Sequence, residues 1–218
     1  DIAPLGLSSF KFKGRDASVV CDPYDQVMVG LKFPAHTTAD IVTISHGHGD
    51  HNNVKIVDPP AGADIIVFNG PGEYEAKGVE ITGIATHHDA KNGAERGKNT
   101  MYKYTIDGIT VVHCGDLGHK LTEEQEDNLG KIDVLLIPVG GVYTIDAATA
   151  AEIATKLEPA IIIPMHYLRP QLNQKVFGSL APVNVFLKEI GKEGITPMSK
   201  LKITKDALPS ETEVVVLE

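Results

Sequence analysis

The chain has 218 residues, of which 42% are hydrophobic and 22% charged, and its formal net charge is −9. This hydrophobic share is enough for a packed core and excludes a disordered chain. The excess of acidic side chains argues against a protein that binds phosphate backbones or anionic lipid, because both partners attract basic patches.

The first half of the chain is predicted to consist mainly of strands. Short runs that alternate, or that are rich in β-branched residues, indicate strands over residues 8–13, 17–21, 40–45, 64–68, 79–85, 100–106 and 110–114. The pair Asp107-Gly108 predicts a tight turn that joins the last two of these strands into a hairpin.

Helices and strands alternate in the second half. Thr122 and Gln125 have the spacing of a capping box, and Gly130 is a suitable helix stop. Further elements are predicted over residues 132–139 (strand), 146–157 (helix), 160–165 (strand) and 183–190 (helix). Because no linker or repeat interrupts this order, we expect one α/β domain over residues 1–218.

Cysteine use and hydropathy bear on the compartment. Cys21 and Cys114 lie far apart in the sequence, so two reduced thiols are expected rather than a disulfide framework. The longest apolar runs, residues 134–139 and 160–165, are too short to span a bilayer. No signal-peptide pattern is visible. These features predict a cytoplasmic protein without a membrane segment.

The nine histidines are the unusual feature of the composition. Eight of them follow predicted strands, and three lie with an aspartate in the run His46-Gly47-His48-Gly49-Asp50-His51. Burying such groups without partners is costly, and His46 and His48 project to the same side of an extended chain. A solvent-exposed loop that is rich in histidine by chance is the alternative, but the spacing favours a metal site.

This run resembles the HxHxDH signature of the metallo-β-lactamase superfamily, and His88, Asp116 and His166 follow in the family's order. The resemblance covers nearly the whole chain and is greatest to the small single-domain Zn-dependent hydrolases, the ascorbate-6-phosphate lactonase-like group. Three further stretches carry it: residues 70–75, 96–100 and 115–119. The implied fold is a four-layer αββα sandwich, in which helices flank two mixed β-sheets.

The resemblance also implies a site for two divalent metal ions. The implied ligands are His46, His48 and His88 for the first ion, Asp50, His51 and His166 for the second, and Asp116 for both. Such ligands suit zinc first, with manganese or iron as alternatives. The implied nucleophile is a hydroxide shared by the ions, and Asp50 or His119 would move protons.

His87 and His113 are expected to support the ligands rather than bind metal. His87 and His88 are neighbours on a strand and point to opposite sides, and the ligand in the family pattern precedes an aspartate, as His88 does. His113 is a candidate hydrogen-bond partner of a ligand. His119 is explained equally well as a structural residue or as a catalytic one.

Two basic residues and one substitution complete the expected site. Arg96 and Lys98 are candidate contacts to an anionic substrate, although their glycine-containing stretch lacks the spacing of a nucleotide-binding loop. Leu7 departs from the related pattern Leu-Gly-His-Ser-Ser-Phe, in which a histidine occupies this position. The seven implied ligands are nevertheless all present.

The sequence therefore predicts a metal-dependent hydrolase that acts on a small ester, lactone, thioester or phosphoester. The alternatives are a non-catalytic metal-binding or regulatory protein, a nuclease or phosphodiesterase, and a di-iron redox protein. The acidic net charge disfavours a nuclease, and the redox relatives carry a carboxylate where His48 stands. The expected partner is a small-molecule substrate, without nucleic acid or membrane, and a homo-oligomer is left open.

Overall fold

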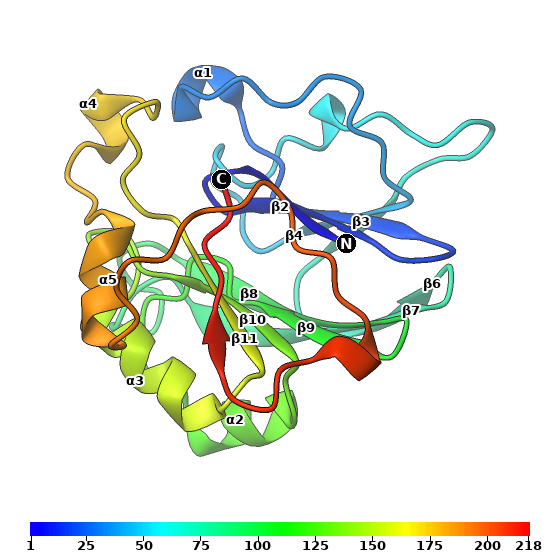
Figure 1. Ribbon diagram of the computed structural model, residues 1–218. Coiled ribbons are helices and arrows are strands. Elements are labelled where there is room, and N and C mark those ends of the chain that lie inside the picture. Colours follow the sequence, from blue (N-terminus) through cyan, green and yellow to red (C-terminus); the bar gives the residue numbers. More distant parts are fainter.

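Two mixed β-sheets, packed face to face, form the framework of the protein in a computed structural model that describes residues 1–218 (Figure 1). The first sheet has the order β1-β2-β3-β4-β5, antiparallel from β1 to β3 and parallel from β3 to β5. Its strands are β1 Ile2–Gly6, β2 Ser9–Lys13, β3 Ser18–Cys21, β4 Ile41–Ile44 and β5 Ile66–Asn69.

The second sheet has seven strands in the order β12-β11-β10-β9-β8-β7-β6. The pairs from β6 to β9 are antiparallel, and those from β9 to β12 are parallel. Its strands are β6 Gly72–Ala76, β7 Val79–His87, β8 Lys98–Ile106, β9 Ile109–His113, β10 Val134–Pro138, β11 Ile161–Met165 and β12 Glu213–Val214.

Helices form the two outer layers, so the predicted αββα sandwich is confirmed. The larger sheet is flanked by α2 Glu123–Leu129, α3 Ala147–Leu157 and α5 Val183–Glu189 (Figure 1). The smaller sheet is flanked by α1 Gln26–Val29 and α4 Gln174–Phe177, two helices of four residues each. The outer layer on this side is therefore thin and consists mostly of loops.

The local signals read from the sequence are present in the structure. Gln125 N–H donates to Thr122 Oγ1 at 3.2 Å, and the Gln125 side chain accepts from Thr122 N–H at 3.0 Å, which completes the capping box. The β8–β9 hairpin turns at Asp107 and Gly108, with φ of 51° and 77°. These two positive φ angles are typical of a type I′ turn.

Strands β1 and β6 were not predicted from the sequence, for two different reasons. β1 contains Pro4, which lacks the N–H that a central strand needs, and it is tolerated because β1 lies at the edge of its sheet. β6 is also an edge strand, and its exposed Glu73 and Glu75 weaken the apolar signal. Both strands are formed by pairing with the next strand of the chain, β2 and β7 respectively.

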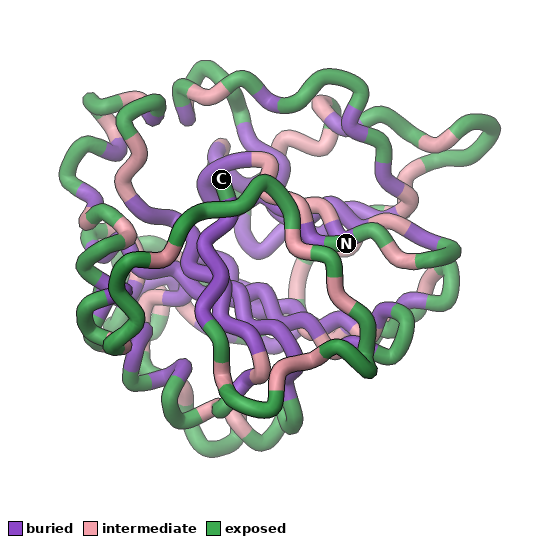
Figure 2. The backbone as a smooth tube through the Cα atoms, viewed as in Figure 1, coloured by how far each residue is buried: buried purple, intermediate pink, exposed green.

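The main core lies between the sheets, where the tube in Figure 2 is almost continuously buried. Phe12 and Ile41 enter it from the smaller sheet, and Tyr104 and Leu136 from the larger one. A second apolar cluster packs under α1 and α4 and includes Tyr24 and Phe177. The two clusters hold both faces of the smaller sheet, so the loops that leave its strands start from fixed points.

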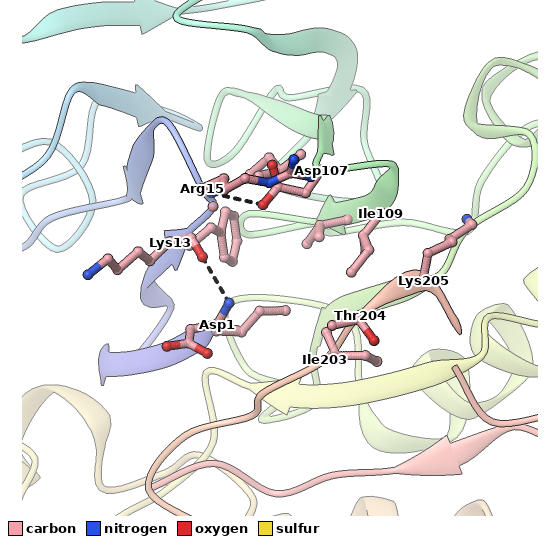
Figure 3. Close-up of a pocket in the computed structure, with 13 residues that line it drawn as sticks. Asp1, Lys13, Arg15, Asp107, Ile109, Ile203, Thr204 and Lys205 are labelled. Carbon is pink, nitrogen blue, oxygen red and sulfur yellow. Dashed lines mark hydrogen bonds between the residues drawn. The ribbon is translucent and has the colours of Figure 1, made fainter. Parts of the chain in front are cut away.

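A cavity of about 320 Å³ opens between the sheets near the start of β9 (Figure 3). Phe12, Ile109 and Ile203 are among its apolar lining residues, and Lys13, Arg15 and Lys205 lie at its rim. No histidine or cysteine lines it. The predicted ligand Asp116 instead follows the opposite end of β9. No helix is long and apolar enough to cross a membrane.

Candidate metal centre

The seven predicted ligands come from the ends of four strands. Residues 46–51 follow β4, His88 follows β7, Asp116 follows β9, and His166 follows β11. Within the larger sheet, β9 and β11 run in the same direction and β7 shares it, because two antiparallel steps separate β7 from β9. The three strands therefore end at one edge of the larger sheet, and the residues that follow them meet those that follow β4 of the smaller sheet.

The structure gathers these side chains into two groups. Within each group, the potential ligand atoms all lie within 4.8 Å of one another. We call His46, His48 and His88 the His46 group, and Asp50, His51, Asp116 and His166 the Asp116 group. The His46 group contains only imidazoles, and the Asp116 group contains two carboxylates.

The Asp116 carboxylate lies between the two groups. Its Oδ2 atom is 3.2 Å from His88 Nε2 and 3.9 Å from His46 Nε2, both in the His46 group. The same oxygen is 3.3 Å from His51 Nε2 and 3.4 Å from His166 Nε2. Four imidazole nitrogens from three separate segments of the chain thus converge on one carboxylate oxygen.

Several of these atoms are buried without a hydrogen-bond partner, which is the signature expected of metal ligands. The unpaired atoms in the two groups are His46 Nε2, His51 Nε2, His88 Nδ1, Asp116 Oδ1, and both ring nitrogens of His166. A buried nitrogen or oxygen without a partner is costly, and a bound cation would relieve that cost. The donor set therefore fits divalent metal ions.

Asp22 orients two of the histidines from behind. Its carboxylate accepts from Ser45 N–H at 2.7 Å, from Ser45 Oγ at 2.6 Å and from His51 Nδ1 at 2.8 Å. Because the Ser45 hydroxyl donates to Asp22, His46 Nδ1 donates to that hydroxyl, at 2.9 Å. Both imidazoles are then held with Nε2 directed at the site, a support typical of metal centres.

The pKa values of the clustered side chains are shifted in different directions. Burial opposes the positive charge of His51, but the carboxylates of Asp116, Asp50 and Asp22 outweigh it and raise the pKa of His51 well above its ordinary value. Burial raises the pKa of Asp116, but the nearby His166 and His51 outweigh it, so the pKa falls well below its usual range. Burial, with His51 nearby, lowers the pKa of His46 to about 3.

Asn99 and His113 hold the turn that presents Asp116. The side-chain oxygen of Asn99 accepts from Asp116 N–H at 2.9 Å, and its amide donates to Cys114 O at 2.9 Å. His113 accepts from Gly115 N–H at its Nδ1 and donates from Nε2 to Ser8 O at 2.7 Å. His113 thus supports the ligand turn through the backbone.

Two glycines touch the backbones of ligand residues. A Cβ atom at Gly118 would overlap the main chain of His88 and Asp89, and one at Gly140 would overlap the carbonyl oxygen of His166. His166 itself has a φ of 52°, a conformation that is uncommon outside glycine. Close approach of the chain therefore sets the position of one ligand in each group.

The other predicted histidines lie away from the centre. His87 points away from His88 and packs against the ring of His119, with centroids 5.6 Å apart. His119 accepts from His87 N–H at 3.1 Å and donates to Lys120 O at 2.7 Å, so both of its ring nitrogens are used within the chain. Neither residue lines the ligand cavity, and this placement favours a structural role for His119.

A cavity of about 260 Å³ adjoins the two ligand groups. Four of the predicted ligands line it, namely His48, Asp50, His88 and Asp116, together with Arg96. Lys98, the other predicted substrate contact, is exposed at the start of β8 and is not part of the lining. The remaining lining residues are Met28, Tyr143, Val176 and Phe177.

Sequence reasoning did not find Asp22, Asn99 or these four wall residues. Asp22 carried no signal in the sequence, because its burial and its φ of 48° become visible only in the fold. Leu7 was identified as a departure from the related pattern. Its side chain is buried in the apolar cluster under α1 and α4, and its carbonyl oxygen accepts from His166 N–H at 3.2 Å.

Comparison with known proteins agrees with this arrangement. A family model described as the beta-lactamase superfamily domain matches residues 1–166. A UPF0173 metal-dependent hydrolase from Thermoplasma acidophilum is 32% identical over 184 residues, covering 74% of this chain and 80% of the relative. One from Nitratidesulfovibrio vulgaris is 28% identical over 189 residues, covering 74% and 77%.

Solved structures extend the similarity over almost the whole chain. A candidate Zn-dependent hydrolase of the metallo-β-lactamase superfamily from Thermotoga maritima is 35% identical, with a TM-score of 0.80 and coverage of 99% of this chain and 97% of that one. Igni18, a metallo hydrolase from Ignicoccus hospitalis, shares the fold with a TM-score of 0.63 at 22% identity, over 99% and 94% of the two chains.

Proposed function

This chain belongs to the metallo-β-lactamase superfamily and is a metal-dependent hydrolase, and we propose that it uses two divalent ions to hydrolyse a small ester, lactone, thioester or phosphoester. The observation that carries the proposal is the position of Asp116 Oδ2, within 3.9 Å of imidazole nitrogens from both ligand groups. A carboxylate in this position suits a ligand shared by two ions.

Each residue has a role in this proposal. His46, His48 and His88 hold one ion, Asp50, His51 and His166 hold the other, and Asp116 contacts both. When bound, the pair of ions supplies a nucleophilic hydroxide near neutral pH and polarises the carbonyl or phosphoryl oxygen under attack. Zinc is the ion that this imidazole and carboxylate set favours first, with manganese and iron as alternatives.

Asp50 is the residue that moves protons in the proposed reaction. Besides Asp116, it is the only carboxylate that lines the cavity. Burial raises the pKa of Asp50, but the adjacent His51 outweighs it and brings this pKa to about 2, so the side chain is an ionised carboxylate at neutral pH. Its proposed role therefore rests on its position in the cavity. His119 has no such position, because it lies outside the cavity.

The dimensions of the cavity favour a small substrate. A volume of about 260 Å³ lies at the low end of ligand pockets and accommodates a small molecule rather than a polymer. Its lining combines the apolar side chains of Met28, Val176 and Phe177 with the ligand residues. A substrate with an apolar portion beside its reacting bond matches this lining.

The proposal is tested by removing and restoring metal. We expect chelated protein to be inactive, and protein reloaded with zinc, manganese or iron to bind two ions per chain and to hydrolyse part of a panel of lactones, thioesters and phosphoesters. His46→Gln should lose metal and activity, whereas His36→Gln, at a histidine whose side chain is 94% exposed far from the site, should keep both. Full activity in metal-free protein would reject the proposal.

A further inference from the structure

Arg96 is the only arginine or lysine that lines the ligand cavity. It forms no ion pair, although the chain carries an excess of nine acidic groups and several exposed lysines do pair with them. A guanidinium that shares a small cavity with bound divalent ions is repelled by them unless an anion lies nearby. Asp50 and Asp116 also line this cavity, but neither forms an ion pair with Arg96, so the guanidinium is available to a negatively charged group of a ligand.

The backbone of Arg96 is held in place by one buried carboxylate. Asp89 follows the ligand His88, and it accepts hydrogen bonds of 2.7–3.0 Å from four backbone N–H groups of the following loop. These groups belong to Lys91, Gly93, Glu95 and Arg96. Four charge-assisted hydrogen bonds make this loop an ordered connection between the metal ligand and the arginine.

The guanidinium is also fixed by contacts with Val142 and Tyr143. Its central carbon lies 5.1 Å from the centroid of the Tyr143 ring, and Nη2 donates to Val142 O at 3.2 Å. Tyr143 is itself anchored, since its hydroxyl donates to Val176 O at 2.6 Å. A guanidinium has five N–H donors, so most of the donors of Arg96 stay available after this contact.

We propose, building on the hydrolase function above, that Arg96 binds an anionic group of the substrate, and that the enzyme therefore prefers small substrates bearing a carboxylate or a phosphate. Tyr143 holds the guanidinium plane, and Asp89 positions the loop. The planar fork matches the geometry of either anion. Val176 and Phe177 line the same cavity and contact the apolar atoms between the anionic group and the reacting bond.

Equilibrium binding to metal-loaded protein tests this assignment without turnover. The probes are malonate, succinate and glutarate, each compared at constant ionic strength with its monomethyl ester, which lacks one negative charge. We expect at least one diacid to bind about tenfold more tightly than its ester, as a charge-assisted hydrogen bond would provide. Phosphonoacetate and 3-phosphonopropionate, run in parallel, show whether carboxylate or phosphate is the better group.

Variants assign the effect to Arg96. Arg96→Gln should remove the preference for the charged probe, and Arg96→Lys should restore part of it, because lysine keeps the charge but not the fork. Lys91→Gln is the matched control, since it removes one charge from an exposed position of the same loop and leaves the cavity lining intact. Its preference should equal that of the unmodified protein.

Three results would overturn the inference: no preference in the unmodified protein, an unchanged preference in Arg96→Gln, or an equal loss in Lys91→Gln. The outcome is separable from that of the proposed function. Arg96-dependent binding without hydrolysis of any panel substrate rejects the hydrolytic mechanism and keeps the anion site. Metal-dependent hydrolysis with no Arg96 effect on binding rejects the anion site alone.

Discussion

The His46 group and the Asp116 group differ in burial and in charge. All four residues of the Asp116 group are buried, whereas His48 in the other group is exposed. The Asp116 group has two carboxylates of its own and a third, Asp22, behind His51. The His46 group has three imidazoles and no carboxylate of its own, and its nearest carboxylate is Asp116.

For the proposed pair of ions, this difference predicts two unequal binding positions. Negative charge and exclusion of water strengthen the attraction for a cation, so we expect the Asp116 group to bind its ion more tightly. The His46 group, with an exposed ligand, is expected to exchange its ion more readily. Four experiments test whether the two groups differ in this way.

Replacing the shared carboxylate should have the largest effect. Asp116→Asn keeps the shape but removes the charge that both groups depend on, so we expect less than one bound ion per chain and a loss of activity of at least about a thousandfold. Elemental analysis and steady-state rates measure the two quantities. Retention of two ions would show that Asp116 is not shared.

Removing one exposed or one buried histidine should separate the groups. His48→Gln is expected to reduce the metal content from two ions to one and leave that ion resistant to a competing chelator. His166→Gln should also leave one ion, which the same chelator removes at a lower concentration. Equal resistance in the two variants would mean that burial and charge do not distinguish the sites.

Asp22→Asn tests the support behind both groups. The amide cannot accept from His51 Nδ1–H and the Ser45 hydroxyl as strongly as the carboxylate does, so both imidazoles lose orientation. Changes to such supporting partners typically cost about 10–100-fold in metal affinity. We expect the larger loss at the Asp116 group, because Asp22 contacts His51 directly and His46 only through Ser45. Metal titrations of the two sites measure this.

The smallest expected difference between the two groups is in the number of protons that each releases when it binds metal. His51 has a pKa well above the ordinary value of about 6.5, so in metal-free protein it stays protonated at neutral pH and must lose that proton to bind metal. Affinity of the Asp116 group should therefore rise about tenfold per pH unit from neutral pH until this raised pKa is passed. His46, with a pKa of about 3, releases none in this range.

The same shift has a consequence for the stability of the metal-free protein. A raised pKa in the folded state contributes stability below about pH 6.5 that is lost as the pH rises through the raised value.

The proton release itself can be counted. Calorimetric metal titration in buffers of different ionisation enthalpy gives the number of protons that the protein releases when it binds metal. A count of zero at neutral pH would contradict the assignment to His51.

The ligands could be predicted from the sequence because their signal is local. Three histidines and an aspartate within six residues are visible without any fold. Strand alternation allows only one of His87 and His88 to be a ligand, and the family pattern, in which the ligand precedes an aspartate, favours His88. The structure agrees, since His88 Nε2 lies 3.2 Å from Asp116 and His87 packs against His119.

The supporting and wall residues could not be predicted, because their roles arise from contacts distant in sequence. Asp22 acts on a serine 23 positions away, and Asn99 acts on an aspartate 17 positions away. Tyr143 enters the cavity from the loop between β10 and α3, and Phe177 enters it from the end of α4; neither belongs to a motif. A side chain of this kind gains its function only when the sheets have packed.

Gly118 and Gly140 give the centre a sensitivity that its donor atoms alone would not suggest. Each lies against the main chain of a ligand residue, His88 in one group and His166 in the other. A single methyl group at either position would displace a ligand while leaving every donor atom chemically intact. The two glycines are therefore separate positions at which the spacing between the two groups can be altered without changing a ligand. Gly118 acts on the His46 group and Gly140 on the Asp116 group.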